Sequence, residues 1–258
     1  MTSTVAAPAR PVLRVRGLSW AVGGAHIVSD VGFDVAEGEF VAVIGPNGAG
    51  KTSLFNLISG LTRSTGGTIE LDGRDITHAP PHRRARQGLG RTFQSSSVFP
   101  ALTVAENVRL AAAAHRGTCL RIWRRAESDR AAWLATAEAL ERVGLAHRAR
   151  ETAGALSHGD KRKLEIAILL ATDPRLILLD EPMAGVGVAD VPALTEVIRS
   201  VHREQGRTVL MVEHHMDVLL GLADRVAVMH HGSLLALDAP DAVMADPVVQ
   251  EAYLGEAL

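Results

Sequence analysis

The sequence has few lysines, few aromatic residues and a single cysteine among its 258 residues. Only three of the 27 basic residues are lysines, namely Lys51, Lys161 and Lys163, so arginine supplies nearly all of the positive charge. Aromatic residues make up 3% of the chain, too few for an extended surface that stacks on bases or sugars. The formal net charge of −2 also lacks the basic excess typical of nucleic-acid-binding domains.

The chain also lacks long hydrophobic runs, and we expect no signal peptide at its start. Its apolar runs, such as those near residues 166–171 and 176–179, are far shorter than the ~20 residues that cross a bilayer. The first residues have neither the basic start nor the apolar stretch of a signal peptide. The lone Cys119 excludes an internal disulfide framework, and we interpret it as a small buried residue in a reducing compartment. We therefore expect any membrane role to act through a partner.

Strand and helix patterns alternate along most of the chain, which predicts an α/β fold. Residues 1–11 are expected to form a flexible tail. From about residue 103 to 154 strand patterns vanish and alanine-rich helical spacing takes over, so an all-helical insertion is predicted there. Strands are expected at residues 12–15, 26–35, 40–44, 67–71, 89–93, 176–179, 208–212, 225–229 and 233–237, and helices at residues 51–59, 104–114, 126–143, 160–171, 191–201 and 216–222.

A glycine-rich loop stands between the apolar run 40–44 and the helix predicted after it. It matches the phosphate-loop pattern G-x-x-x-x-G-K-[ST], which wraps backbone N–H groups around phosphate oxygens. Lys51 would neutralise the β- and γ-phosphates, and the Thr52 hydroxyl would coordinate Mg²⁺. A plain glycine-rich turn is the alternative, but the flanking strand and helix favour phosphate binding. The expected nucleotide-binding residues here are Gly45, Pro46, Asn47, Gly48, Ala49, Gly50, Lys51, Thr52 and Ser53.

A second motif is the apolar strand at 176–179, which ends in Asp180 and Glu181. Acidic residues at the carboxyl end of a parallel strand face the crevice where ligands bind. Asp180 is expected to hold the Mg²⁺ shell, and Glu181 to position or deprotonate the attacking water. A solvated strand end is the alternative when this motif is considered alone. The phosphate loop alone allows a GTPase, a small-molecule kinase or a helicase-like motor.

The segment Leu156-Ser157-His158-Gly159-Asp160 decides among these classes. It resembles the L-S-x-G signature of ABC (ATP-binding cassette) ATPases, and it follows the helical insertion and precedes the acidic strand end as in that family. Gln94 matches the glutamine of the family's Q-loop, and His214 matches its switch histidine. The resemblance covers about residues 12–258.

The resemblance implies a RecA-like parallel-sheet core with an antiparallel β subdomain and a helical subdomain. Its boundaries would be 12–95 and 160–237 for the core and β subdomain, 96–159 for the helical subdomain and 238–258 for a helical tail. Gln94 would join the metal shell, and His214 would contact the γ-phosphate and the attacking water. Ser157 and Gly159 would face the γ-phosphate bound by a second subunit, so a lone chain would have an incomplete active site.

Two positions depart from the family pattern. The ring that usually stacks on adenine is replaced by Val22, and Trp20, two residues earlier, could serve instead. Packing without a nucleotide contact is the alternative role for Trp20. In the loop after Glu181, Gly187 stands where the family usually has Asp or Asn. That side-chain contact across the dimer must therefore be absent.

Further segments resemble the ATPase subunits of branched-chain amino acid importers, namely Gly90-Arg91-Thr92-Phe93-Gln94, residues 103–108 and the terminal Ala252-Tyr253-Leu254-Gly255-Glu256. Urea and amide importer ATPases share many of these features. The implied partners are a second ATPase subunit, identical or homologous, integral membrane permease subunits and, indirectly, a solute-binding protein. The chain would then lie at the cytoplasmic face of the membrane. A nucleic-acid-linked ABC ATPase is the rival, favoured only by the basic stretch His82-Arg83-Arg84-Ala85-Arg86, and we expect no nucleic-acid partner.

Overall fold

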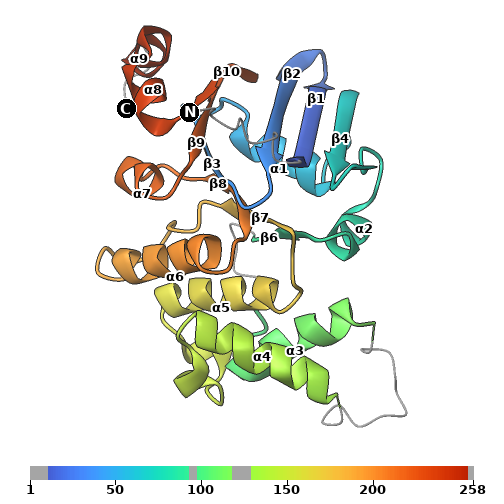
Figure 1. Cartoon of the computed structure of the whole chain (residues 1–258), viewed down its shortest axis with the longest axis vertical. Helices are drawn as coiled ribbons and strands as arrows, with labels where there is room; N and C mark the ends of the chain where they lie inside the picture. The colour runs from blue at the N-terminus through green and yellow to red at the C-terminus, as the bar shows by residue number, and fades with distance from the viewer. Residues whose placement is uncertain (1–10, 93–97, 118–128, 255–258) are drawn as a thin grey trace, which may run out of the picture. The chain divides into compact units, whose positions relative to one another are not determined.

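The computed structural model describes residues 11–92, 98–117 and 129–254, with only the backbone given for residues 253 and 254 (Figure 1). The chain divides into two compact units, which are described separately below. Unit 1 combines Met1–Gln87 with Arg207–Leu258, and unit 2 is Gly88–Gly206. Among the described residues no helix is long and apolar enough to span a membrane.

An antiparallel sheet forms one layer of unit 1, with strand order β2-β1-β4-β5. Gly23 and Gly24 form the tight turn between the two long strands, and both have positive φ. Every second residue from Val31 to Val35 on β2, namely Val31, Phe33 and Val35, is buried, which explains the alternation in the sequence. The strands are β1 (Pro11–Val22), β2 (Ala25–Ala36), β4 (Gly66–Leu71) and β5 (Arg74–Asp75).

The other strands of unit 1 follow the order β10-β9-β3-β8, in which β3 pairs in parallel with both β8 and β9. All five residues of β3 are buried, as expected for a strand covered on both faces. Helix α1 follows β3 directly through the glycine-rich loop (Figure 1). The elements are β3 (Phe40–Ile44), α1 (Lys51–Ser59), α2 (Pro81–Arg86), β8 (Thr208–Val212), α7 (Met216–Leu220), β9 (Arg225–His230), β10 (Ser233–Asp238), α8 (Pro240–Ala245) and α9 (Pro247–Leu254).

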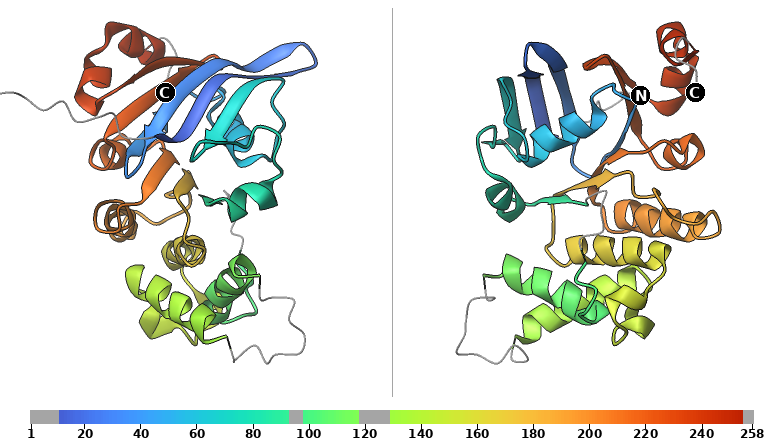
Figure 2. Two further views of the ribbon diagram at one scale, coloured as in Figure 1. Left: turned by 45° about the vertical axis from the view of Figure 1, so that its right-hand side comes forward. Right: turned by 180° about the vertical axis from the view of Figure 1, so that it is seen from behind.

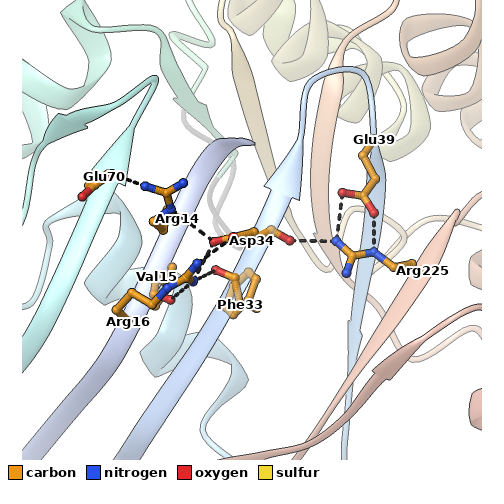
Figure 3. Close-up of polar contacts among 8 residues, drawn as sticks. All are labelled: Arg14, Val15, Arg16, Phe33, Asp34, Glu39, Glu70 and Arg225. Atoms are coloured by element: carbon orange, nitrogen blue, oxygen red, sulfur yellow. Dashed lines mark hydrogen bonds and ion pairs between the residues drawn. The ribbon is translucent and has the colours of Figure 1, made fainter. Parts of the chain in front are cut away.

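A network of charged side chains ties the strands of unit 1 together (Figure 3). Arg16 on β1 donates to the Asp34 carboxylate on β2 at 2.7 Å. Arg225 on β9 donates to the Asp34 carbonyl at 2.7 Å and pairs with the Glu39 carboxylate. Arg225 and Glu39 are the more buried pair, so they are screened less by solvent than the half-exposed Arg16 pair.

Unit 2 contains the short parallel pair β6–β7 and a cluster of helices. Helices α3, α4 and α5 contact one another and lie side by side in Figure 2, coloured green to yellow. Thr103 and Glu106 form a capping box that starts α3, in which each side chain satisfies a backbone N–H of the other. The elements are β6 (Leu89–Arg91), α3 (Val104–His115), α4 (Arg130–Arg142), η2 (Ala146–Arg148), η3 (Ala153–Ala155), α5 (His158–Leu170), β7 (Leu176–Asp180) and α6 (Val191–Arg203).

The predicted elements agree closely with these observations, and the α/β architecture is confirmed. The strand at 40–44, the helix at 51–59 and the strand at 208–212 have the predicted bounds. The first strand is longer than expected and reaches Val22, while α4 starts at Arg130 and part of its expected span lies outside the described residues. The two-residue strand β5 was not predicted, because its exposed Arg74 and Asp75 carry no apolar pattern.

Candidate nucleotide-binding site

Two glycines of the phosphate loop in unit 1, Gly45 and Gly50, could not be replaced by another residue without a shift of the backbone around them. Gly45 and Gly50 both have positive φ, at 151° and 96°. A Cβ at Gly45 would lie 2.2 Å from the Met229 carbonyl oxygen, and one at Gly50 would lie 2.8 Å from that of Ile27. The loop is therefore pressed against the backbone of β9 and β2.

Lys51 closes the loop from its helical end. Its side chain is only 6% exposed, and Nζ donates to the carbonyl oxygens of Gly45 at 2.5 Å and Pro46 at 2.9 Å. None of the described side chains caps the N-terminus of α1, where Gly50 is the N-cap residue. A buried ammonium and the positive end of a helix thus meet at one loop, an arrangement that suits a phosphate group.

Two further contacts brace the loop and its helix within unit 1. The Gly232 N–H donates to the Ala49 carbonyl at 3.1 Å, which links the β9–β10 turn to the loop. At the far end of α1, the buried Arg84 donates to the carbonyls of Leu57 and Ile58, each at 2.7 Å. Burial lowers the pKa of Arg84 to about 10, so the guanidinium still carries its charge at neutral pH. This charge stabilises the negative end of the helix dipole.

Asp180 ends β7 in unit 2 as a buried, half-paired carboxylate. It is 1% exposed, and its Oδ2 accepts a hydrogen bond from Nη2 of Arg91 at 2.8 Å. Burial raises the pKa of Asp180, the Arg91 guanidinium opposes that rise, and neighbouring Glu181 adds to it. Oδ1 is buried and has no hydrogen-bond partner among the described residues. Hard divalent cations prefer oxygen ligands such as this carboxylate oxygen, so Asp180 fits a place in a Mg²⁺ site.

Glu181 follows in a strained backbone conformation. Its φ is 49°, in the left-handed region that non-glycine residues rarely adopt. The Ala184 N–H donates to the Glu181 carbonyl at 3.0 Å and closes the turn that holds this conformation. The side chain is partly exposed, unlike that of Asp180. Strain of this kind is retained where a side chain must point in one direction, which is typical of functional sites.

The residues of the predicted signature lie at the start of α5, also in unit 2. Ser157 is the N-cap and accepts a hydrogen bond from the Asp160 N–H at 3.1 Å. Gly159 is buried, and a Cβ there would lie 3.0 Å from the Asp190 side chain. Arg148 pairs with Asp160 and Glu151 beside the cap. The predicted helix entrance is therefore present, with a small residue where close approach requires one.

Three further predicted residues, His214, Trp20 and Val22, lie near the ends of strands in unit 1. His214 is exposed two residues after the end of β8, and its backbone N–H donates to the buried Glu213 carboxylate at 2.8 Å. Trp20 is half-buried and pairs with Val28, whereas Val22 is 53% exposed. The β1–β2 register shifts between Trp20 and Ala21, so simple alternation does not continue to Val22. Gln94, like Cys119, lies outside the described residues.

Within each unit the structure brings predicted residues together. Gly45, Gly50 and Lys51 share one loop in unit 1. In unit 2, Arg91 and Thr92 contact Asp180, a role that the sequence analysis missed. The pairing of β6 with β7 was the signal that could have found them, since it sets Arg91 beside Leu178. Among the described residues, no three His, Cys, Asp or Glu side chains cluster as a metal site made of protein ligands alone.

Comparisons with known proteins agree with this arrangement. Residues 28–184 match the family model described as ABC transporter, and residues 233–258 match one described as branched-chain amino acid ATP-binding cassette transporter. The high-affinity branched-chain amino acid transport ATP-binding protein BraF of Pseudomonas aeruginosa is 40% identical over 96% of this chain and 99% of its own. LivG of Escherichia coli strain K12, which bears the same description, is 39% identical over the same shares.

Solved structures show the same fold. The ADP conformation of MJ1267, an ATP-binding cassette of an ABC transporter, superimposes with a TM-score of 0.84 at 28% identity and covers 96% of this chain and all of its own. A nucleotide-free ATP-binding cassette from an ABC transporter gives a TM-score of 0.83 at the same identity and coverage. The chain therefore belongs to the ABC transporter family as an ATP-binding cassette, which makes it an ATPase.

Proposed function

We propose that this chain is the ATP-hydrolysing subunit of an importer of branched-chain amino acids. The observation that carries the solute class is the match of residues 233–258 to the branched-chain amino acid cassette model. Identity of 40% to BraF along nearly the whole of both chains supports the same assignment. An importer of urea, amides or another solute remains the alternative, because the solute is recognised by other subunits.

The phosphate loop would bind the triphosphate. Lys51 now donates to the loop's own carbonyls of Gly45 and Pro46, so the loop and its cation are preorganised before nucleotide arrives. We infer that phosphate oxygens take over the ammonium of Lys51 and receive the backbone N–H groups of residues 45–53. The slim ammonium suits this wrapped position better than a planar guanidinium. Trp20 would supply the contact with adenine, with packing as its alternative role.

Hydrolysis would depend on residues at the two other motifs. Glu181 would take the proton of the attacking water as the water's oxygen bonds to the γ-phosphorus and the bond to ADP breaks. His214 would contact the γ-phosphate and that water. Thr52, Gln94 and Asp180 would hold Mg²⁺, which would spread the developing negative charge when bound. The strained backbone of Glu181 supports this role, since it fixes where the carboxylate points.

Two cassettes would work together. We infer that Ser157 and Gly159 at the start of α5 meet the γ-phosphate held by a second ATPase subunit, identical or homologous. The helical segment 96–159 would receive the permease, which would place the chain at the cytoplasmic face of the membrane. A dimeric structure of the bacterial ABC transporter cassette MJ0796 is known, but at 24% identity it supports only the fold of this chain.

Transport by the reconstituted complex tests the proposal. The chain is co-expressed with the permease subunits and binding protein encoded beside it, and uptake of labelled leucine into proteoliposomes is measured with ATP supplied on the cassette side. Leucine uptake is expected to require ATP and to stop with Glu181→Gln, while nucleotide binding by that variant persists. Uptake of urea or an amide in place of leucine, with the same ATP dependence, would transfer the assignment to the alternative. Hydrolysis without uptake of leucine would contradict the assignment to branched-chain amino acids.

A further inference from the structure

The last residue of β6 and the residue after it hold the acidic end of β7. Arg91 donates to Oδ2 of Asp180 at 2.8 Å, and the Thr92 hydroxyl accepts the Asp180 backbone N–H at 3.2 Å. The Thr92 N–H donates to the Leu178 carbonyl at 3.0 Å. Side chain and backbone of Asp180 are therefore both held by two neighbouring residues.

The Arg91–Asp180 pair is almost completely shielded from water. The two side chains are 7% and 1% exposed. Removing one partner of such a pair leaves a buried charge without compensation, which destabilises a fold far more than losing an exposed pair does. The positive charge of Arg91 therefore stabilises the buried carboxylate of Asp180 inside unit 2.

The second carboxylate oxygen of Asp180 is not bonded to Arg91. Oδ1 is buried and has no hydrogen-bond partner among the described residues. A buried acceptor without a partner costs free energy and is rare, and an ion that binds to it during function is one explanation for its presence. Arg91 thus occupies one oxygen and leaves the other for a cation.

Resting on the role proposed above for Asp180, we propose that Arg91 is a positioning residue and the resident counter-charge of Asp180. It neutralises the carboxylate while no divalent cation is bound. It also holds the affinity for that cation below the value that Asp180 would give without it. Metal would then bind firmly only together with the nucleotide and leave with the products.

The charges determine whether Arg91 strengthens or weakens metal binding. A guanidinium bound to Oδ2 lies close to any cation bound to Oδ1 of the same carboxylate, and the two repel each other strongly in a buried setting. Removing the charge of Arg91 should therefore tighten metal binding while it destabilises the metal-free chain. A merely structural ion pair would behave differently, since its loss would lower stability and leave metal affinity unchanged or weaker.

Arg91→Gln and Arg91→Lys in the full chain test the proposal, with Mn²⁺ as the probe. Binding of Mn²⁺ in the presence of ADP is titrated by electron paramagnetic resonance, and thermal unfolding is followed with chelator and with Mn²⁺–ADP. Arg91→Gln is expected to bind Mn²⁺ roughly three- to tenfold more tightly than the natural chain, because one repulsive charge is gone. It should unfold at a lower temperature in chelator and regain most of that loss with Mn²⁺–ADP.

Arg91→Lys keeps the charge and is expected to stay within about twofold of the natural affinity. Unchanged or weaker Mn²⁺ binding by Arg91→Gln would overturn the proposal, as would a variant that stays unfolded even with Mn²⁺ and ADP. Failure of the complex with the permease subunits and binding protein to hydrolyse ATP would instead contradict the proposed function, which the Mn²⁺ titration does not measure.

Discussion

Gly60 lies directly against the guanidinium of Arg84, so closely that a Cβ on Gly60 would stand 2.7 Å from Nε and 2.9 Å from Cζ. Gly60 is the C-cap of α1 with φ of 79°, and Arg84 comes from α2. Four backbone carbonyls accept from Arg84, so its side chain has no freedom to move aside. The end of the helix that begins with Lys51 is thus fixed by a residue 24 positions further along the chain.

Gly60→Ala is therefore expected to destabilise the chain by roughly 3 kcal/mol, through backbone strain and overlap with Arg84. The measurement is urea unfolding of the nucleotide-free protein. Gly24→Ala is the matched control, since Gly24 also has positive φ but a Cβ there would meet nothing within 4 Å. It should cost only about 1 kcal/mol, the strain alone. An equal loss in the free energy of unfolding for the two variants would show that the Arg84 side chain moves aside, contrary to this prediction.

Gly45→Ala tests the contact of the phosphate loop with β9. The added methyl would overlap the Met229 carbonyl, a backbone atom that cannot rotate away, so β3 and β9 would have to separate. We expect a loss of roughly 3 kcal/mol in the free energy of unfolding without nucleotide. Gly48→Ala, in the same loop with φ of 82° and no neighbour within 4 Å, should lose only about 1 kcal/mol. A Gly48→Ala variant as unstable as Gly45→Ala would refute the role of the Met229 contact.

These glycines also show how far sequence reasoning could go. The spacing from Gly45 to Lys51 predicted a phosphate loop between a buried strand and a helix, and local structure followed that pattern. What it could not reveal is that Gly45 and Gly50 are also required by the carbonyls of Met229 and Ile27. Those contacts come from strand pairing between distant segments, which local periodicity does not encode.

The acidic motif likewise combines features that the local sequence predicts with others that depend on contacts between distant segments. The pattern at 176–181 predicted a buried strand ending in two carboxylates, and β7 has that form. The counter-charge of Asp180 is Arg91, which is distant in sequence and becomes its neighbour only because β6 pairs with β7. The pattern equally could not predict the positive φ of Glu181, because that conformation depends on the turn that follows.

Glu106 should make the stability of unit 2 depend on acid pH. Its carboxylate accepts hydrogen bonds from the Thr103 N–H and hydroxyl, each at 2.8 Å, which holds the pKa of Glu106 below its ordinary value of 4.5. Because folding favours the ionised form, this stabilisation is complete above pH 4.5 and is lost as pH falls through the lowered value. Glu106→Gln should therefore be less stable than the natural chain near neutral pH, and the gap should shrink below pH 4.5. Urea unfolding across this range is the measurement, and a gap that stays constant would contradict the assignment.

Ser157→Ala and Thr103→Ala form a pair that separates helix capping from nucleotide contact. Each residue is the N-cap of a helix in unit 2, and each hydroxyl accepts the backbone N–H three residues later. Each substitution should therefore cost about 1 kcal/mol of stability. If Ser157 also meets a nucleotide, Ser157→Ala should lower the ATPase rate at least tenfold at saturating enzyme, whereas Thr103→Ala should leave it nearly unchanged. Steady-state hydrolysis and urea unfolding of both variants are the measurements, and an equal fall in rate would reduce Ser157 to a helix cap.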